Sequence, residues 1–131
     1  MAKTFQLEII TPESAQNLGQ ITYLRAPSID GLFGILAGHA ISMIALGVGE
    51  IKVENGNEIS YWATSGGYAD IRPEGVQLLV ETAEKSSDID KERAQTSLKR
   101  AEDRSKNSEM DQARARGSIA RAKNRLNILN R

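Results

Sequence analysis

The heptapeptide Asp88–Ala94 lies where one kind of polypeptide ends and another begins, and this boundary limits what the chain can fold into. All six aromatic residues, all three prolines and ten of the eleven glycines precede it; only Gly117 follows it. The later part is mostly Ala, Arg, Lys, Asp, Glu and Ser with scattered aliphatic residues. A chain of 131 residues holds one small domain and an appended element. We therefore divide it into residues 1–86 and 87–131.

The first part alternates between apolar and polar residues with a period of two, as in Phe5–Ile9, which is typical of half-buried β-strands. Asn55 and Gly56 lie between two such runs and predict a hairpin, because both residues tolerate positive φ. Arg72–Gly75 predicts a second hairpin, with Pro73 at the second position of a type I turn. Shorter strands are predicted at Ile21–Ala26, Gly34–Leu36 and Met43–Val48. Many short, closely spaced strands predict a small sandwich or flattened barrel.

The second part has helical spacing, and Ser87 or Asp88 is predicted to cap its first helix. Residues 105–108 are polar and predict a turn between two helices. The apolar seam is narrow and consists of Ala94, Leu98 and Ala101, then Ala115, Ile119, Ala122, Leu126 and Leu129. Two antiparallel helices joined this way bury little apolar area, so the hairpin needs a partner, a ligand or the sandwich to stay folded. The predicted fold class is α+β.

Charge is distributed unevenly, although the formal net charge is zero. Residues 1–83 carry four basic and nine acidic groups, whereas residues 111–131 carry six basic groups and one acid. This gradient predicts an acidic partner for the tail: a protein, a nucleic acid, a nucleotide or the acidic first part itself. A single histidine and no cysteine exclude a zinc cluster and a Cys–His pair, so we assign no catalytic and no metal-binding residues.

The predicted hairpin brings basic residues near the start of its first helix. Arg121 and Arg125 are i, i+4 neighbours, and antiparallel closure places them near Asp90 and Arg93. Guanidinium groups around a helix N-terminus favour a polyphosphate, and Asp90 is suited to accept a hydrogen bond from a base or ribose. The alternative is that these arginines form a solvated face or intrahelical ion pairs.

Three stretches of the chain, in this order, resemble segments of one known family. They are Gly34–Ala40 (GILAGHA), Ser65–Pro73 (SGGYADIRP), and Thr82–Glu84 followed by Asp88–Asp90 and Arg93-Ala94. With the two-part organisation, the whole chain resembles the epsilon-subunit family of F-type ATP synthases. The resemblance implies a ten-stranded β-sandwich followed by a two-helix hairpin.

The resemblance also implies a role. Members of the family are non-catalytic central-stalk (rotor) subunits that bind the gamma subunit and the c-ring and couple ion translocation to ATP synthesis. The implied location is the cytoplasmic face of the cell inner membrane, or the stromal or cytoplasmic face of a thylakoid membrane, reached only through the complex. The hairpin permits turnover when it is folded down, and when extended it contacts the alpha and beta subunits and inhibits ATP hydrolysis. No cofactor is required, and ATP is the implied regulatory ligand.

The resemblance transfers three sets of residues to this chain. The implied ATP site consists of Glu84, Ile89, Asp90, Arg93, Ala94, Arg121 and Arg125. The implied c-ring and gamma contact consists of Gly31, Leu32, Phe33 and His39. The implied beta-subunit contact of the extended hairpin consists of Arg114, Arg116, Arg121, Lys123 and Arg125. Leu32 stands where many relatives have an acidic residue, so a more apolar c-ring contact is expected.

A second hypothesis is a nucleic-acid-binding module that uses the basic C-terminal helix. Two features count against it. The acidic first part would repel phosphates, and no aromatic residue lies near the basic helix to stack on a base.

Overall fold

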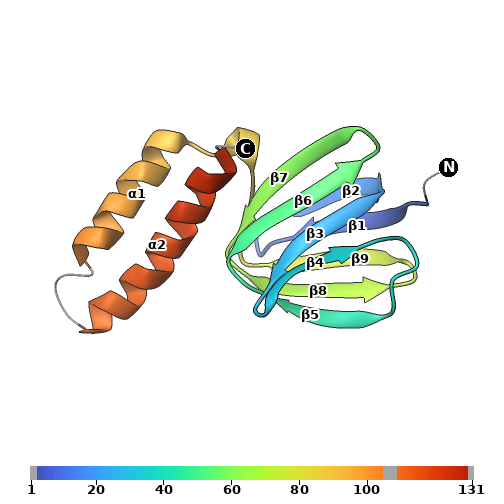
Figure 1. The fold of residues 1–131 in the computed structure, drawn as a ribbon, viewed down its shortest axis with the longest axis horizontal. Helices are drawn as coiled ribbons and strands as arrows, with labels where there is room; N and C mark the ends of the chain where they lie inside the picture. The colour runs from blue at the N-terminus through green and yellow to red at the C-terminus, as the bar shows by residue number, and fades with distance from the viewer. Residues whose placement is uncertain (1–2, 105–108, 130–131) are drawn as a thin grey trace.

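The computed structural model describes residues 3–104 and 109–129, which form a curled β-sheet followed by two helices (Figure 1). The ten strands are β1 (Phe5–Ile10), β2 (Ala15–Ile21), β3 (Tyr23–Ser28), β4 (Gly31–Ile35), β5 (Ser42–Leu46), β6 (Gly49–Asn55), β7 (Glu58–Thr64), β8 (Gly67–Arg72), β9 (Gly75–Val80) and β10 (Ala83–Lys85). A 3₁₀ turn, η1 (Ser86–Asp88), leads into α1 (Lys91–Arg104) and α2 (Glu109–Leu129). The α+β prediction, a ten-stranded β-sandwich followed by two helices, is confirmed. The predicted turn at 105–108 lies outside the described residues.

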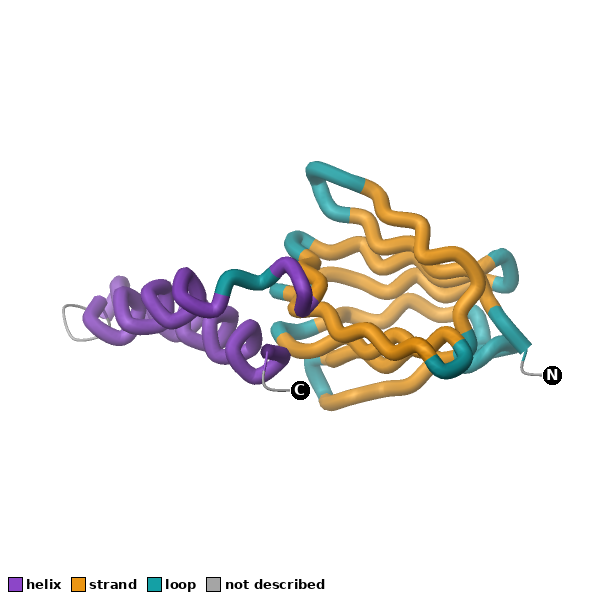
Figure 2. The backbone as a smooth tube through the Cα atoms, turned by 90° about the horizontal axis from the view of Figure 1, so that it is seen from above, coloured by secondary structure: helices purple, strands orange, loops and turns teal. Residues whose placement is uncertain are grey.

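The strands form one sheet in the order β10-β7-β6-β3-β5-β8-β9-β1-β2, with β4 beside β3. The pairing of β1 with β9 is parallel, and the other strand pairs are antiparallel. Figure 2 shows the sheet curling on itself, with the helices at one end. The curled sheet encloses a core whose fully buried members include Leu7, Ile9, Leu24, Ile51 and Leu78. Alternation along β1 therefore places its apolar face inside, as the sequence pattern predicts.

The turns between strands agree with the predicted hairpins, with one correction. Arg72 pairs with Gly75 across the two-residue turn of the β8–β9 hairpin, as predicted. In the β6–β7 hairpin, Asn55 is the last strand residue and pairs with Glu58, so the two turn residues are Gly56 and Asn57. Among the described residues only glycines have positive φ, and Gly56 has a φ of 62°. Glycine at the first turn position and an ordinary φ at the second indicate a type II′ turn, not the turn with two positive φ values that we expected.

The connection from β7 to β8 requires glycine. Gly66 and Gly67 have φ values of 119° and 147°, and a Cβ on Gly67 would lie 2.1 Å from the carbonyl oxygen of Leu79. A side chain would thus collide with the backbone of β9, the strand paired with β8. This close approach explains the Ser-Gly-Gly sequence as a tight strand connection.

The predicted cap of the first helix is wrong by two residues or more. Ser87 and Asp88 belong to the 3₁₀ turn, and α1 begins at Lys91. Asp90 is the cap: its Oδ1 accepts a hydrogen bond from the backbone N–H of Arg93 at 3.1 Å. An aspartate in this position satisfies a free N–H group and places negative charge at the positive end of the helix dipole.

The two helices pack side by side through small residues. Ala94, Ala101, Ala115 and Ala122 are buried, whereas the leucines of the predicted seam are only half-buried. Alanines let the two backbones approach closely but bury little area. The helical hairpin therefore depends on its contact with the sandwich, as its composition predicts.

The contact between hairpin and sandwich is formed by the end of α2, which lies against β6 and β7 (Figure 1). Ile128 is 1% exposed and forms a small apolar cluster with Ala63 of β7 and with Ile89. Asn124 donates a hydrogen bond from Nδ2 to the carbonyl oxygen of Gly49 at 2.6 Å. The sequence analysis missed Ile128 and Asn124, because neither lies in the seam between the helices.

Replacing Ile128 by Ala is expected to release the hairpin without unfolding the sandwich. Removing three buried carbon atoms costs about 2–5 kcal/mol in a packed core, and the remaining links across this contact include one hydrogen bond and one partly exposed ion pair. Hydrogen exchange should then accelerate in α1 and α2 but not in the strands. Asn127→Ala, which alters the exposed neighbour, is the control. Unchanged protection of the helices in Ile128→Ala would show that another contact fixes the hairpin.

Candidate functional site

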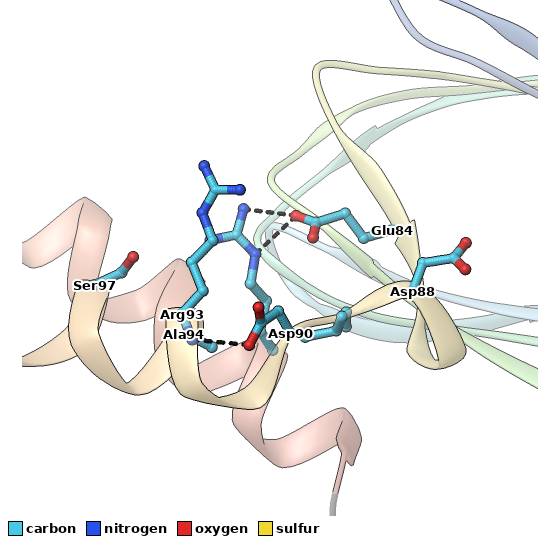
Figure 3. A pocket seen from close by; sticks show the side chains of 8 residues that line it. Glu84, Asp88, Asp90, Arg93, Ala94 and Ser97 are labelled. Carbon is cyan, nitrogen blue, oxygen red and sulfur yellow. Dashed lines mark hydrogen bonds and ion pairs between the residues drawn. The ribbon is translucent and has the colours of Figure 1, made fainter.

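A pocket lies where the last strand, the start of the first helix and the end of the second helix meet (Figure 3). Its volume is about 310 Å³, at the lower end of the range for small-molecule sites. The lining residues are Glu84, Asp88, Ile89, Asp90, Arg93, Ala94, Ser97 and Arg125. Three separate elements contribute to it, so the pocket exists only while the hairpin is docked.

An ion pair between Glu84 and Arg125 joins α2 to β10. Nε and Nη2 of Arg125 lie 2.7 and 2.6 Å from the same carboxylate oxygen, Oε1 of Glu84. The side chains are 28% and 35% exposed for Arg125 and Glu84, so water screens the pair only in part. A guanidinium has five N–H donors, and this geometry leaves those of Nη1 for another acceptor.

Of the two arginines that line the pocket, Arg93 is the one without a side-chain partner in the part of the chain that the structure describes. Its side chain rises from the first turn of α1 on the pocket side, whereas the Asp88 carboxylate points away from it (Figure 3). Among the described residues, no hydrogen bond or ion pair holds its guanidinium, and the residue is exposed. The positive end of the α1 dipole lies beside it. Arg93 is therefore placed to receive an anionic group of a ligand.

Apolar residues form part of the wall. Ile89 and Ala94 are 9% and 3% exposed, and both line the pocket. The combination of a small apolar wall, two guanidiniums and nearby carboxylates suits a ligand that carries both a flat apolar part and anionic groups.

The structure brings together six of the seven residues of the implied ATP site; the exception is Arg121. Arg121 lies one helical turn before Arg125, and its Nη2 donates a hydrogen bond to Oγ of Ser118 at 3.2 Å. It lines a separate narrow crevice, shared with Glu84 and Arg125. The sequence analysis did not include Asp88 and Ser97 in the site. Ser97 lies four residues after Arg93 and so on the same face of the helix. This spacing could have predicted that Ser97 lines the site.

The implied c-ring and gamma contact is divided between the two ends of β4. Gly31 and Leu32 are exposed at its start, where Leu32 has 64% of its surface accessible, and Phe33 is half-buried behind them. His39 is exposed in the loop after β4, where its Nδ1 lies 3.0 Å from the carbonyl oxygen of Ala40.

The implied beta-subunit contact is partly turned toward the sandwich in this state. Arg114, Arg116 and Lys123 are exposed on α2, whereas Arg121 and Arg125 are only partly accessible. Arg125 is engaged by Glu84. Arg121 and Arg125 are therefore less accessible than the other three basic residues in the docked state.

Comparison with known proteins places the chain in a family. The family described as "ATP synthase, Delta/Epsilon chain, beta-sandwich domain" matches residues 4–86, and "ATP synthase, Delta/Epsilon chain, long alpha-helix domain" matches residues 87–130. The chain belongs to the ATP synthase delta/epsilon family. The resemblance drawn from the three sequence stretches is thereby confirmed.

Individual relatives agree with the family assignment. The chain is 41% identical over 104 residues to the ATP synthase epsilon chain of Desulforamulus reducens, covering 79% of each. It is 39% identical to that of Koribacter versatilis, covering 79% of this chain and 73% of the relative. These matches give no support to the nucleic-acid alternative.

Solved structures agree on the fold. A chain of the Euglena gracilis mitochondrial ATP synthase superposes with a TM-score of 0.83 at 20% identity, covering 92% of this chain and 78% of that chain. A chain from the central stalk and c-ring structure of the Tetrahymena thermophila enzyme gives a TM-score of 0.64 at 13% identity, covering 98% of both. Within the described part of this delta/epsilon-family chain, neither helix has the length and apolar character needed to cross a membrane.

Proposed function

We propose that this chain is a non-catalytic central-stalk subunit of a rotary ATP synthase, which binds the gamma subunit and the c-ring and turns with them. Membership of the delta/epsilon family supports this role, as does an exposed leucine, Leu32, at the implied contact. Such a subunit couples ion translocation to ATP synthesis by transmitting rotation. It reaches the membrane only through the complex, on the cytoplasmic face of the cell inner membrane or the stromal or cytoplasmic face of a thylakoid membrane.

The helical hairpin is the regulatory part of the proposed subunit. In the docked state, a small apolar cluster around Ile128, one hydrogen bond from Asn124 and the Glu84–Arg125 ion pair hold it to the sandwich. This small contact suits a two-state element, because a ligand can shift the equilibrium only when the two states differ by a few kcal/mol. In the extended state, the basic residues of α2 reach the alpha and beta subunits and inhibit ATP hydrolysis.

ATP is the proposed ligand of the pocket. The observation that carries this proposal is that residues of β10, α1 and α2 line one pocket, in which Arg93 is free to bind phosphate. A ligand that bridges these elements binds the docked hairpin and not the extended one. By mass action, it therefore favours the docked, permissive state.

Leu32→Lys is expected to weaken coupling in the assembled enzyme. The side chain is 64% exposed on β4, so the change should leave folding intact but place a desolvated charge in an apolar c-ring contact. Ion pumping per ATP hydrolysed should fall in membrane vesicles, and the chain should dissociate more readily. Ile59→Lys, at another apolar position that is 51% exposed, is the matched control. Equal coupling in both variants would remove Leu32 from the contact.

A further inference from the structure

The docked end of α2 is bonded directly to the sandwich backbone at the start of β6. Nδ2 of Asn124 donates its hydrogen bond to the carbonyl oxygen of Gly49 at 2.6 Å, in a partly buried position. Gly49 follows the loop between β5 and β6, which lies at the end of the sandwich nearest the helices (Figure 1). The hairpin is thus tied to the end of this loop, and undocking of α2 frees the carbonyl group.

Gly49 lies directly against the ring of Pro27. A Cβ on Gly49 would come within 2.6 Å of Cβ and 2.8 Å of Cγ of that proline. Gly49 has no positive φ, so the close packing, and not the backbone conformation, requires glycine at this position. Pro27 is buried, and its ring cannot bend away as a flexible side chain could. A displacement of the Gly49 backbone is therefore transmitted to β3.

Pro27 also supports the turn between β3 and β4. Its carbonyl oxygen accepts a hydrogen bond from the backbone N–H of Gly47 at 3.0 Å, and it pairs with Leu32 across the two strands. The turn is closed by Oγ of Ser28, which donates to the carbonyl oxygen of Gly31 at 2.7 Å. A turn closed in this way moves together with the strand ends that carry it. The contacts that begin at the hairpin therefore reach the exposed leucine at the start of β4.

We propose that Gly49 and Pro27 link docking of the hairpin to the β3–β4 turn, so that Leu32 is held in one position while α2 is docked and gains freedom when α2 leaves. This inference rests on the proposed c-ring contact and the proposed hairpin switch, and it joins the two. The docked and the released hairpin are the two states, and packed groups and hydrogen bonds carry the difference between them to the turn. Such a link is reciprocal, so a partner that fixes the turn at Leu32 favours the docked hairpin.

Hydrogen exchange and amide chemical shifts of the full-length chain test the link. Asn124→Leu removes the donor but still fills its place, and exchange of the Gly47 N–H should accelerate about fivefold, as the loss of one hydrogen bond predicts. The amide resonance of Leu32 should shift as well. Ile128→Ala, which releases the hairpin at a different contact, should produce the same two changes. Asn127→Ala, at an exposed position of α2, should produce neither.

A change of the connecting residue makes the test specific to this path. Pro27→Ala removes the ring that lies against Gly49. In that background, the shift of the Leu32 resonance caused by Ile128→Ala should fall by about half or more. An equal shift in both backgrounds would overturn the role of Pro27.

The outcomes separate this inference from the proposed function. Faster exchange in α1 and α2 with no change at Gly47 and Leu32 would overturn the link, but it would leave the hairpin switch and the c-ring contact in place. A change that reaches Gly47 and stops before Leu32 would overturn the link as well. Normal ion pumping by an enzyme that carries Leu32→Lys would instead contradict the c-ring contact, and the link within the chain would stand.

Discussion

Deleting residues from Ser87 onward is expected to raise ATP hydrolysis by the assembled complex, on the order of fivefold or more, while binding to the gamma subunit persists. The deletion removes the element that inhibits when extended. The sandwich should tolerate it, because every residue of the main core cluster lies within residues 5–83. Steady-state hydrolysis by complexes reconstituted with the full and the shortened chain measures the effect.

The shortened chain needs two controls. Its thermal unfolding should match that of the sandwich in the full chain, and it should co-purify with the gamma subunit in equal amounts. Ile128→Ala provides the opposite perturbation, because it frees the hairpin without removing it and should lower hydrolysis. Equal hydrolysis by the full and shortened complexes would contradict the inhibitory role.

Replacing Arg93 by Ala is expected to weaken ATP binding about 10- to 100-fold. A hydrogen bond to a charged group contributes about 1.5–3 kcal/mol, and Arg93 has no competing partner among the described residues. The side chain is exposed, so its removal should not disturb the fold. Calorimetric titration of the full chain with ATP gives the affinity and the number of sites, which should be one.

Arg100→Ala is the matched control for Arg93→Ala, because Arg100 is an exposed arginine two turns after Arg93 on the same helix and does not line the pocket. Its affinity for ATP should equal that of the unmodified chain. Equal affinities in Arg93→Ala and the unmodified chain would show that Arg93 does not hold the phosphates. No heat at millimolar ATP in the unmodified chain would remove ATP as the ligand.

Local sequence patterns predicted the turns and strands whose conformation depends on neighbouring residues. The β8–β9 turn follows from Pro73 and Gly75, and the sandwich follows from period-two alternation. Strand β2 was not predicted, because its exposed edge carries polar residues with little alternation. The helix start was misplaced because Ser87, Asp88 and Asp90 are all good caps, and only the path of the chain after β10 selects Asp90.

The sequence predicted which arginines come together in the candidate site. It did not predict which carboxylate pairs with Arg125. Helical spacing and antiparallel closure bring Arg125 near Asp90 and Arg93, and the structure places all three around one pocket. Which carboxylate Arg125 would select depends on how α2 meets β10, a tertiary contact fixed by Ile128. The same contact directs Arg121 toward the crevice. Neither the partner of Arg125 nor the direction of Arg121 can be predicted from the spacing of residues along the helix.

The parallel pairing of β1 with β9 has a consequence for how the chain folds as it is synthesised. Leu7 and Ile10 pair with Val76 and Leu79, so the first strand, which can pair early with β2, completes its pairing only after β9 has left the ribosome. Such distant pairing slows folding, because a long loop must close before any contact compensates for its entropy. The hairpin emerges after β9, when the sandwich is ready to receive it. Docking of α2 can therefore follow the folding of the sandwich, and we expect its reversal to need less free energy than unfolding of the strands.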